Sequence, residues 1–118
     1  MRTATEIWFE KLKDIWLRKA SDEIKELVSD NFSYYEDPFE APVTDKGKLT
    51  EMWKEIEGQD IELLEIDSLV AGDSLGSARY HFVAQINGAR HESKGSYFVE
   101  LDKEGKAIEF RQWWNTKK

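Results

Sequence analysis

One short stretch of the chain, residues 32–42, brings together groups that could do chemistry. Its sequence, FSYYEDPFEAP, holds four aromatic rings, three acidic side chains and both of the chain's prolines. A carboxylate held in apolar surroundings has a raised pKa, which lets it act as an acid or a base near neutral pH. Asp37 is the candidate for such a group if the rings around it (Tyr35, Phe39 and Trp53) keep water away. The alternative is that Asp37 accepts backbone N–H groups in a proline turn, as Asp commonly does.

The composition predicts a single folded domain over residues 1–118. Hydrophobic residues make up 40% of the chain and aromatic residues 13%, which is enough for a sizeable core. The formal net charge is −7 and no run of Lys and Arg forms a basic stripe, so a nucleic-acid partner is not expected.

Several other classes of site and location are also disfavoured. The chain has no cysteine, which excludes disulfides and thiolate ligands, and its two histidines have no metal-binding spacing. We therefore expect neither a metal nor a cofactor. No apolar run approaches the ~18 residues that cross a bilayer. The first residues lack the apolar stretch of a signal peptide, so we expect a cytoplasmic protein that does not bind membranes.

The first half of the chain has apolar residues at helical spacing. A helix is expected over 6–19 with a cap at Thr3 or Thr5, a second short helix from Ser21, and a third over 48–56. These three segments contain most of the apolar residues that precede the strands.

From Ile61 onward the period changes to two, which is typical of strands. The pair Asn87-Gly88 is a strong two-residue hairpin signal, so neighbouring strands are expected to form an antiparallel meander. Helices followed by such a meander indicate the α+β class, in which the helices cover one face of a curled sheet. The expected strands are 61–71, 76–87, 89–101 and 107–114.

Alternation along the strands groups the side chains into two faces. Tyr80 and Phe82 project to one face, and Val83 projects to the other. The second face also carries Phe98 and Trp113, so it is not cleanly polar. This mixed row predicts that the outer face is covered by a second copy of the chain, giving a homodimer.

A resemblance to a known family rests on EDPF at 36–39 with Pro42 following, Trp53, Asn87-Gly88, and LDKEGKAIEFRQWW at 101–114. With its expected order of helix, helix, strand, helix and four strands, essentially the whole chain resembles the nuclear transport factor 2-like superfamily. The resemblance is to its SnoaL-like and ketosteroid isomerase-like domains. It implies a cone-shaped α+β barrel, in which a curled antiparallel sheet and three helices on its concave face enclose one apolar pocket. It also implies a homodimer through the outer sheet face.

The resemblance also implies roles for two residues. In ketosteroid isomerases the acid of the EDP motif is the proton-shuttling base, so Asp37 takes this role here, and Tyr97 takes that of a hydrogen-bond donor across the pocket. The chain departs from the isomerase pattern because no tyrosine precedes Tyr34, so the first helix lacks the catalytic phenol. The alternative for Tyr97 is a core tyrosine bonded to a backbone carbonyl.

The remaining site candidates are substrate-binding residues, most of which the resemblance places on the pocket side. Most tryptophans are expected in the core, and His91 lies near the hairpin, where strand ends reach solvent. Glu36 is expected at the surface, and the acids near residues 51–60 on a solvated helix face. The substrate-binding candidates are Tyr35, Trp53, Tyr80, Phe82, His91, Phe110, Gln112 and Trp114.

Two functions follow from these residues. In the first, an isomerase-, cyclase- or lyase-like enzyme acts on a small apolar carbonyl or cyclic compound: Asp37 moves a proton, while Tyr97 and Gln112 stabilise the developing oxyanion. In the second, the chain is a non-catalytic ligand-binding or dimeric assembly module, which the missing phenol and the many rings favour. One fold supports both kinds of protein, so the sequence leaves open whether this one is an enzyme.

Overall fold

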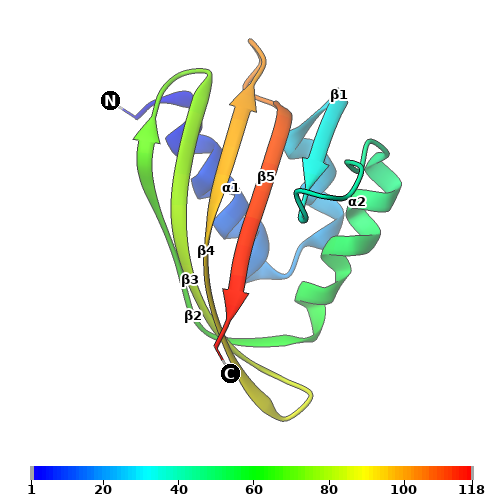
Figure 1. Cartoon of the computed structure of the whole chain (residues 1–118), viewed down its shortest axis with the longest axis vertical. Helices are drawn as coiled ribbons and strands as arrows, with labels where there is room; N and C mark the ends of the chain where they lie inside the picture. Colours follow the sequence, from blue (N-terminus) through cyan, green and yellow to red (C-terminus); the bar gives the residue numbers. More distant parts are fainter. Residues whose placement is uncertain (1, 118) are drawn as a thin grey trace.

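The computed structural model describes residues 2–117, in which helices come first and a long meander follows (Figure 1). The observed elements are α1 (Ala4–Arg18), the 3₁₀ helix η1 (Ser21–Leu27), β1 (Val28–Tyr35), α2 (Lys46–Trp53), the 3₁₀ helix η2 (Lys54–Gly58), β2 (Gln59–Ala71), β3 (Leu75–Ile86), β4 (Ala89–Leu101) and β5 (Ala107–Thr116). Within this range no helix is both long and apolar enough to cross a membrane.

The strands form one five-stranded sheet in the order β1-β5-β4-β3-β2. The four later strands make the expected antiparallel meander. Between β3 and β4 the two turn residues, Asn87 and Gly88, both have positive φ, as a two-residue hairpin requires. The sheet is nevertheless mixed, because β1 lies at its edge parallel to β5, with Tyr34 opposite Phe110.

The helix ends follow local chemistry only in part. Thr3 caps α1 and forms a capping box with Glu6, as one of the two expected caps. The expected cap at Ser21 does not form: its hydroxyl donates to Glu57 instead and joins η1 to η2. The third helix is α only as far as Trp53 and continues as 3₁₀.

The core lies between α1 and the concave face of the sheet. Figure 1 shows α1 crossing behind the strands. Ring centroids of Trp8 and Phe110 are 4.8 Å apart, and those of Trp16 and Phe82 are 4.9 Å apart. Each of these fully buried rings contributes about 2–3 kcal/mol by leaving water. The apolar stripe of α1 therefore fixes the helix on the sheet, as an α+β cone requires.

Gly95 lets the strands approach one another beneath an aromatic ring. It pairs with Tyr80 on β3 and with Trp114 on β5. A Cβ at this position would lie 2.0 Å from the carbonyl oxygen of Trp113 and 2.8 Å from the Tyr80 ring. Only glycine leaves room for both the Trp113 carbonyl and the Tyr80 ring, so Gly95 allows this ring to lie close over the strand.

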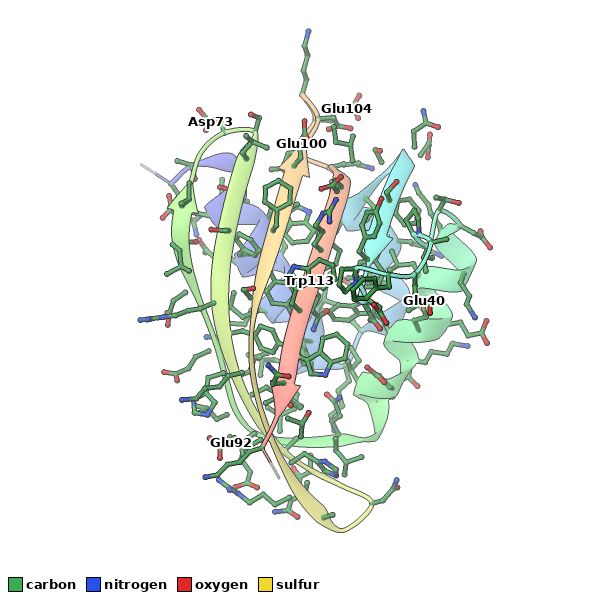
Figure 2. The ribbon with its side chains drawn as sticks, viewed as in Figure 1. Glu40, Asp73, Glu92, Glu100, Glu104 and Trp113 are labelled. Atoms are coloured by element: carbon green, nitrogen blue, oxygen red, sulfur yellow. The ribbon has the colours of Figure 1, made fainter. Side chains whose placement is uncertain are left out.

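The outer face of the sheet combines ion pairs with a few apolar side chains. Figure 2 shows Trp113 on the face turned away from α1. The side chain of Val83 is only 4% exposed, while Phe98 and Trp113 are half-buried. Around them, His81 lies 2.7 Å from Glu92. The three apolar residues expected on this face therefore share it with charged groups.

Candidate functional site

A hollow of about 200 Å³ opens at the end of the cone nearest the β3–β4 hairpin. Its walls combine aromatic and polar side chains. The lining residues are Trp16, Glu55, Gln59, Tyr80, Phe82, Ile86, His91, Ser93, Gln112, Trp114 and Thr116. They come from α1, η2 and four strands (β2 through Gln59), so no single element builds the site.

A second surface hollow has a different character. A groove of about 440 Å³ beside α1 and η1 is lined mainly by charged side chains. One of them, Arg18, already pairs with Asp14 at 2.7 Å and with Glu23 at 2.9 Å. Exposed charges that satisfy one another leave little to recognise a small apolar molecule, so we take the hollow at the cone mouth as the candidate site.

A row of polar side chains runs from the hollow into the core. The Gln112 amide nitrogen lies 3.4 Å from the Tyr80 hydroxyl, and the Gln112 amide oxygen lies 3.1 Å from the Tyr34 hydroxyl. The Tyr34 hydroxyl is also hydrogen-bonded to the Glu36 carboxyl group. The row thus crosses β3, β5 and β1 and ends on a carboxyl group.

The backbone explains why the row ends at Glu36. Tyr34 exchanges two backbone hydrogen bonds of 2.9 Å with Val43, so the loop between them is a closed excursion from the edge of the sheet. Phe32 and Tyr34 are buried, and Glu36, in the bend that follows β1, is hydrogen-bonded to the Tyr34 hydroxyl on the same side. The loop therefore directs this acid inward.

The surroundings of the row favour neutral phenols. Burial raises the pKa of Tyr34 well above its usual range, and the charge of Glu36 acts in the same direction, while the nearby Trp53 indole opposes both slightly. Burial also raises the pKa of Tyr80 to about 12. Burial raises that of Tyr97 well above its usual range, with smaller contributions from Tyr80 and Glu36. The charge of Glu36 thus reaches all three phenols.

A second carboxyl group lies at the hollow itself. Glu55 is exposed overall but lines the hollow. Desolvation raises its pKa, and the charge of Glu36 adds to this rise. A carboxyl group with a raised pKa is a stronger base when ionised, as proton transfer near neutral pH requires.

Two buried donors next to the row have no partner. Among residues 2–117, the inaccessible Tyr97 hydroxyl has no hydrogen-bond partner, and the inaccessible Trp53 indole N–H has none in good geometry, although it lies close enough to the Tyr34 hydroxyl to oppose the rise of that phenol's pKa. Their rings lie 5.7 Å and 6.5 Å from that of Phe110, measured between centroids. An unsatisfied buried donor costs stability, so each position is less favourable than an apolar ring of the same shape would be.

Solved structures share this architecture over nearly the whole chain. A protein of Mycobacterium tuberculosis, Rv0760c, in complex with estradiol-17β-hemisuccinate, aligns with a TM-score of 0.81 at 11% identity, covering 97% of this chain and 95% of its own. SalBIII, described as an epoxide hydrolase/cyclase-like enzyme in pyran ring formation, aligns at 0.73 and 15% identity, with 94% and 92% covered. A steroid delta-isomerase from Pseudomonas aeruginosa aligns at 0.68 and 7% identity, with 98% and 82% covered.

The chain has the nuclear transport factor 2-like fold. No protein-family model matches it, and no curated protein matches it by sequence. The resemblance carried by EDPF and by residues 101–114 is thereby confirmed as a likeness of fold. At these identities it says nothing about substrate or catalysis.

Within this fold, five of the substrate-binding candidates meet at the hollow, namely Tyr80, Phe82, His91, Gln112 and Trp114. Three other candidates (Trp53, Tyr97 and Phe110) are buried outside its lining. Among residues 2–117, no three His, Asp or Glu side chains gather in a way that could hold a metal ion.

Asp37 and Tyr35 lie away from the hollow. Asp37 is exposed, and its carboxylate accepts the backbone N–H of Phe39 at 2.9 Å, which is the turn arrangement. The rings expected to shield it do not do so: Phe39 is 96% exposed, and the Tyr35 ring lies 4.4 Å beneath the Arg111 guanidinium group. The structure thus directs Glu36 inward and Asp37 outward, the reverse of the sequence expectation.

Sequence patterns did not predict several of the residues that line the hollow. The sequence predicts most tryptophans in the core and the acids near residues 51–60 on a solvated helix face, yet Trp16 and Glu55 both line the hollow. The change from α to 3₁₀ helix at Lys54 alters the angular position of Glu55, which helical spacing over 48–56 does not anticipate. For Glu36 a signal existed, since it has the same parity as Phe32 and Tyr34.

The two buried tyrosines beside Phe110 should respond oppositely to loss of their hydroxyls. Tyr97→Phe removes an unpaired donor, so we expect the free energy of unfolding to rise by about 1 kcal/mol. Tyr34→Phe removes the group that joins Glu36 to Gln112, so we expect it to fall by about 1–3 kcal/mol. Urea denaturation at pH 7 measures both, and a Tyr97→Phe variant that is clearly less stable would contradict the absence of a partner.

Proposed function

We propose that the hollow binds a small, compact and largely apolar molecule that carries a carbonyl or hydroxyl oxygen. The observation that carries this proposal is the polar pair of Tyr80 and Gln112 within a wall that includes Trp16, Phe82 and Trp114. Rings contribute apolar contact, and a few fixed polar groups orient the bound molecule, as is general for small-molecule sites.

The size of the hollow supports a ligand of one ring. Its volume of about 200 Å³ is below the range of ~300–1,000 Å³ typical of sites for drug-sized molecules. Four fused rings would exceed it. Trp114 is 40% exposed at the rim, where its ring can stack on a part of the ligand that emerges from the hollow.

Proton transfer is a second candidate function, favoured by the position of Glu55. Its carboxyl group lines the hollow together with Tyr80 and Gln112. As a base, Glu55 would take a proton from the carbon next to a bound carbonyl. The C–H electron pair moves to the carbonyl oxygen, where the Tyr80 hydroxyl donates a hydrogen bond, and the proton then returns to the same or another carbon.

We propose further that two copies of the chain associate through the outer sheet face. The row of Val83, Phe98 and Trp113 supports this, because half-buried aromatic side chains on a sheet face are typical of protein interfaces. The neighbouring ion pairs supply a polar rim around the row.

The adjacent residues Trp114 and Trp113 provide a matched test of ligand binding. With cyclohexanone as the probe, followed by NMR chemical shifts, we expect saturable binding that Trp114→Ala weakens by about two- to tenfold because ring contact is lost. Trp113→Ala should leave the dissociation constant unchanged, since Trp113 is on the other face. Absence of binding by a panel of monocyclic ketones and lactones would contradict the proposal.

Exchange of the α-protons of cyclohexanone in D₂O tests proton transfer without a known product. We expect the protein to accelerate deuterium incorporation and Glu55→Gln to reduce the acceleration by about 100-fold or more. Asp37→Asn should leave it unchanged, because Asp37 faces solvent. Loss of exchange in Asp37→Asn alone would instead restore the base implied by the EDPF motif.

Light scattering tests the association of copies. At micromolar concentration we expect twice the mass of 13.8 kDa. Trp113→Lys should give the monomer, because it places a charge in the centre of the interface. Trp114→Lys is the control and should remain dimeric; a monomeric wild-type chain would overturn the proposal.

A further inference from the structure

The hydroxyl of Tyr34 poses a problem of proton number. It has one proton but two oxygen neighbours, the Glu36 carboxyl group and the Gln112 amide oxygen, which is 3.1 Å away. A phenol can donate to only one of them. The other contact needs its own proton, either from a protonated Glu36 or from the amide nitrogen of a Gln112 side chain turned by 180°.

Two complete arrangements satisfy the whole row. With Glu36 protonated, it donates to Tyr34, Tyr34 donates to the Gln112 oxygen, and the Gln112 nitrogen donates to Tyr80. With Glu36 ionised and the Gln112 amide turned, every hydrogen bond reverses: Tyr80 donates to Gln112, Gln112 donates to Tyr34, and Tyr34 donates to the carboxylate. Each buried group has a partner in both arrangements.

The two arrangements present different chemistry to the hollow. Tyr80 and Gln112 both line it. When Glu36 is protonated, the Tyr80 O–H is free to donate to a bound ligand. When Glu36 is ionised, the Tyr80 O–H donates to the Gln112 amide oxygen, and the Tyr80 oxygen can then only accept a hydrogen bond from a ligand.

We propose that the protonation state of Glu36 sets the orientation of the Gln112 amide and thereby decides whether the Tyr80 hydroxyl donates to a ligand in the hollow. Gln112 is the positioning residue of this relay, and Glu36 its titrating end. A carbonyl oxygen only accepts, so it binds the protonated arrangement better. A hydroxyl both donates and accepts, so it fits either arrangement. The statement about ligands rests on the proposed binding function, whereas the orientation of Gln112 does not.

The groups whose pKa values the charge of Glu36 raises restrict which titration can turn the amide. They are Tyr34 from β1, Tyr80 from β3, Tyr97 from β4 and Glu55 from η2. The phenols stay protonated below pH 10, because their pKa values are raised from the usual value of ~10. Between pH 3 and 8, Glu55 is the one competing group among these four.

A ligand-free experiment tests the relay. The side-chain amide of Gln112 is followed by ¹⁵N–¹H NMR from pH 3 to 8, together with the ¹³C shift of the Glu36 carboxyl group. We expect both to change with one midpoint. The internal control is Gln59, a second buried amide at the hollow, whose oxygen accepts the Trp16 indole N–H at 2.8 Å. Its amide should not follow that midpoint.

Variants separate the contributing acids. Glu36→Gln keeps a neutral donor next to Tyr34, so the Gln112 amide should no longer titrate and should keep its low-pH shift. Glu55→Gln and Asp37→Asn should leave the titration in place. A Gln112 amide that ignores the Glu36 midpoint, or that titrates unchanged in Glu36→Gln, would overturn the proposal.

Ligand affinity provides the second readout, with cyclohexanone and cyclohexanol as matched probes. We expect cyclohexanone to bind about three- to tenfold more tightly below the Glu36 midpoint than above it, because one hydrogen bond to the ligand is gained. Cyclohexanol should show no such change. In Glu36→Gln the ketone should bind with the low-pH affinity throughout. If the Gln112 amide titrates but neither probe binds, the proposed function is rejected and the relay stands. If the affinity for cyclohexanone does not change across the Glu36 midpoint, the ligand part of the relay is rejected.

Discussion

The parallel pairing of β1 with β5 holds one polar row inside an otherwise aromatic interior. It puts Tyr34 opposite Phe110, with ring centroids 4.8 Å apart, and within reach of Gln112 two residues further along. Without this register the Tyr34 hydroxyl would have no amide neighbour, and Glu36 would lack the phenol that holds it. The polar chemistry of the cone therefore depends on an edge strand, which is held by one neighbouring strand and by the short bridge to Val43.

The interior keeps polar groups that a purely stabilising core would replace. Tyr97 and Trp53 carry donors without partners, at a cost of about 1–3 kcal/mol each. Phenylalanine at position 97 would fill the same space without that cost. Natural proteins commonly retain such unfavourable groups where a site must bind or react. Here both donors belong to rings that lie near Phe110, the residue opposite Tyr34, with centroids 5.7 Å and 6.5 Å from its ring.

The two faces of the sheet are separated residue by residue. In the neighbouring pair Glu36 and Asp37, Glu36 is bonded to the buried Tyr34 and Asp37 faces solvent. In the neighbouring pair Trp113 and Trp114, Trp114 lines the hollow and Trp113 lies on the outer face. This separation follows from the period of two in extended chain. It also means that a shift of one residue in the register of β1 would exchange the half-buried acid for the one in solvent.

Much of the architecture followed from local patterns in the sequence. Helical spacing predicted the three helical segments, alternation predicted the four strands of the meander to within two residues at each end, and Asn87-Gly88 predicted the hairpin. The same alternation grouped side chains by face, and the resemblance to the family indicated which face lines the pocket; Tyr80, Phe82, His91, Gln112 and Trp114 do line the hollow. These are short-range properties, which the order of residues determines directly.

The tertiary structure alone decided the rest. The parallel partner of β1 lies more than 70 residues away in the chain, so no local pattern could specify it. The motif EDPF indicated that an acid matters in this loop, but only the structure shows that Glu36 is hydrogen-bonded to the buried Tyr34 while Asp37 accepts a hydrogen bond from the exposed turn. The meeting of Trp16, Glu55 and Gln59 with the strands depends on how helices and sheet pack, which sums many weak contacts between distant residues.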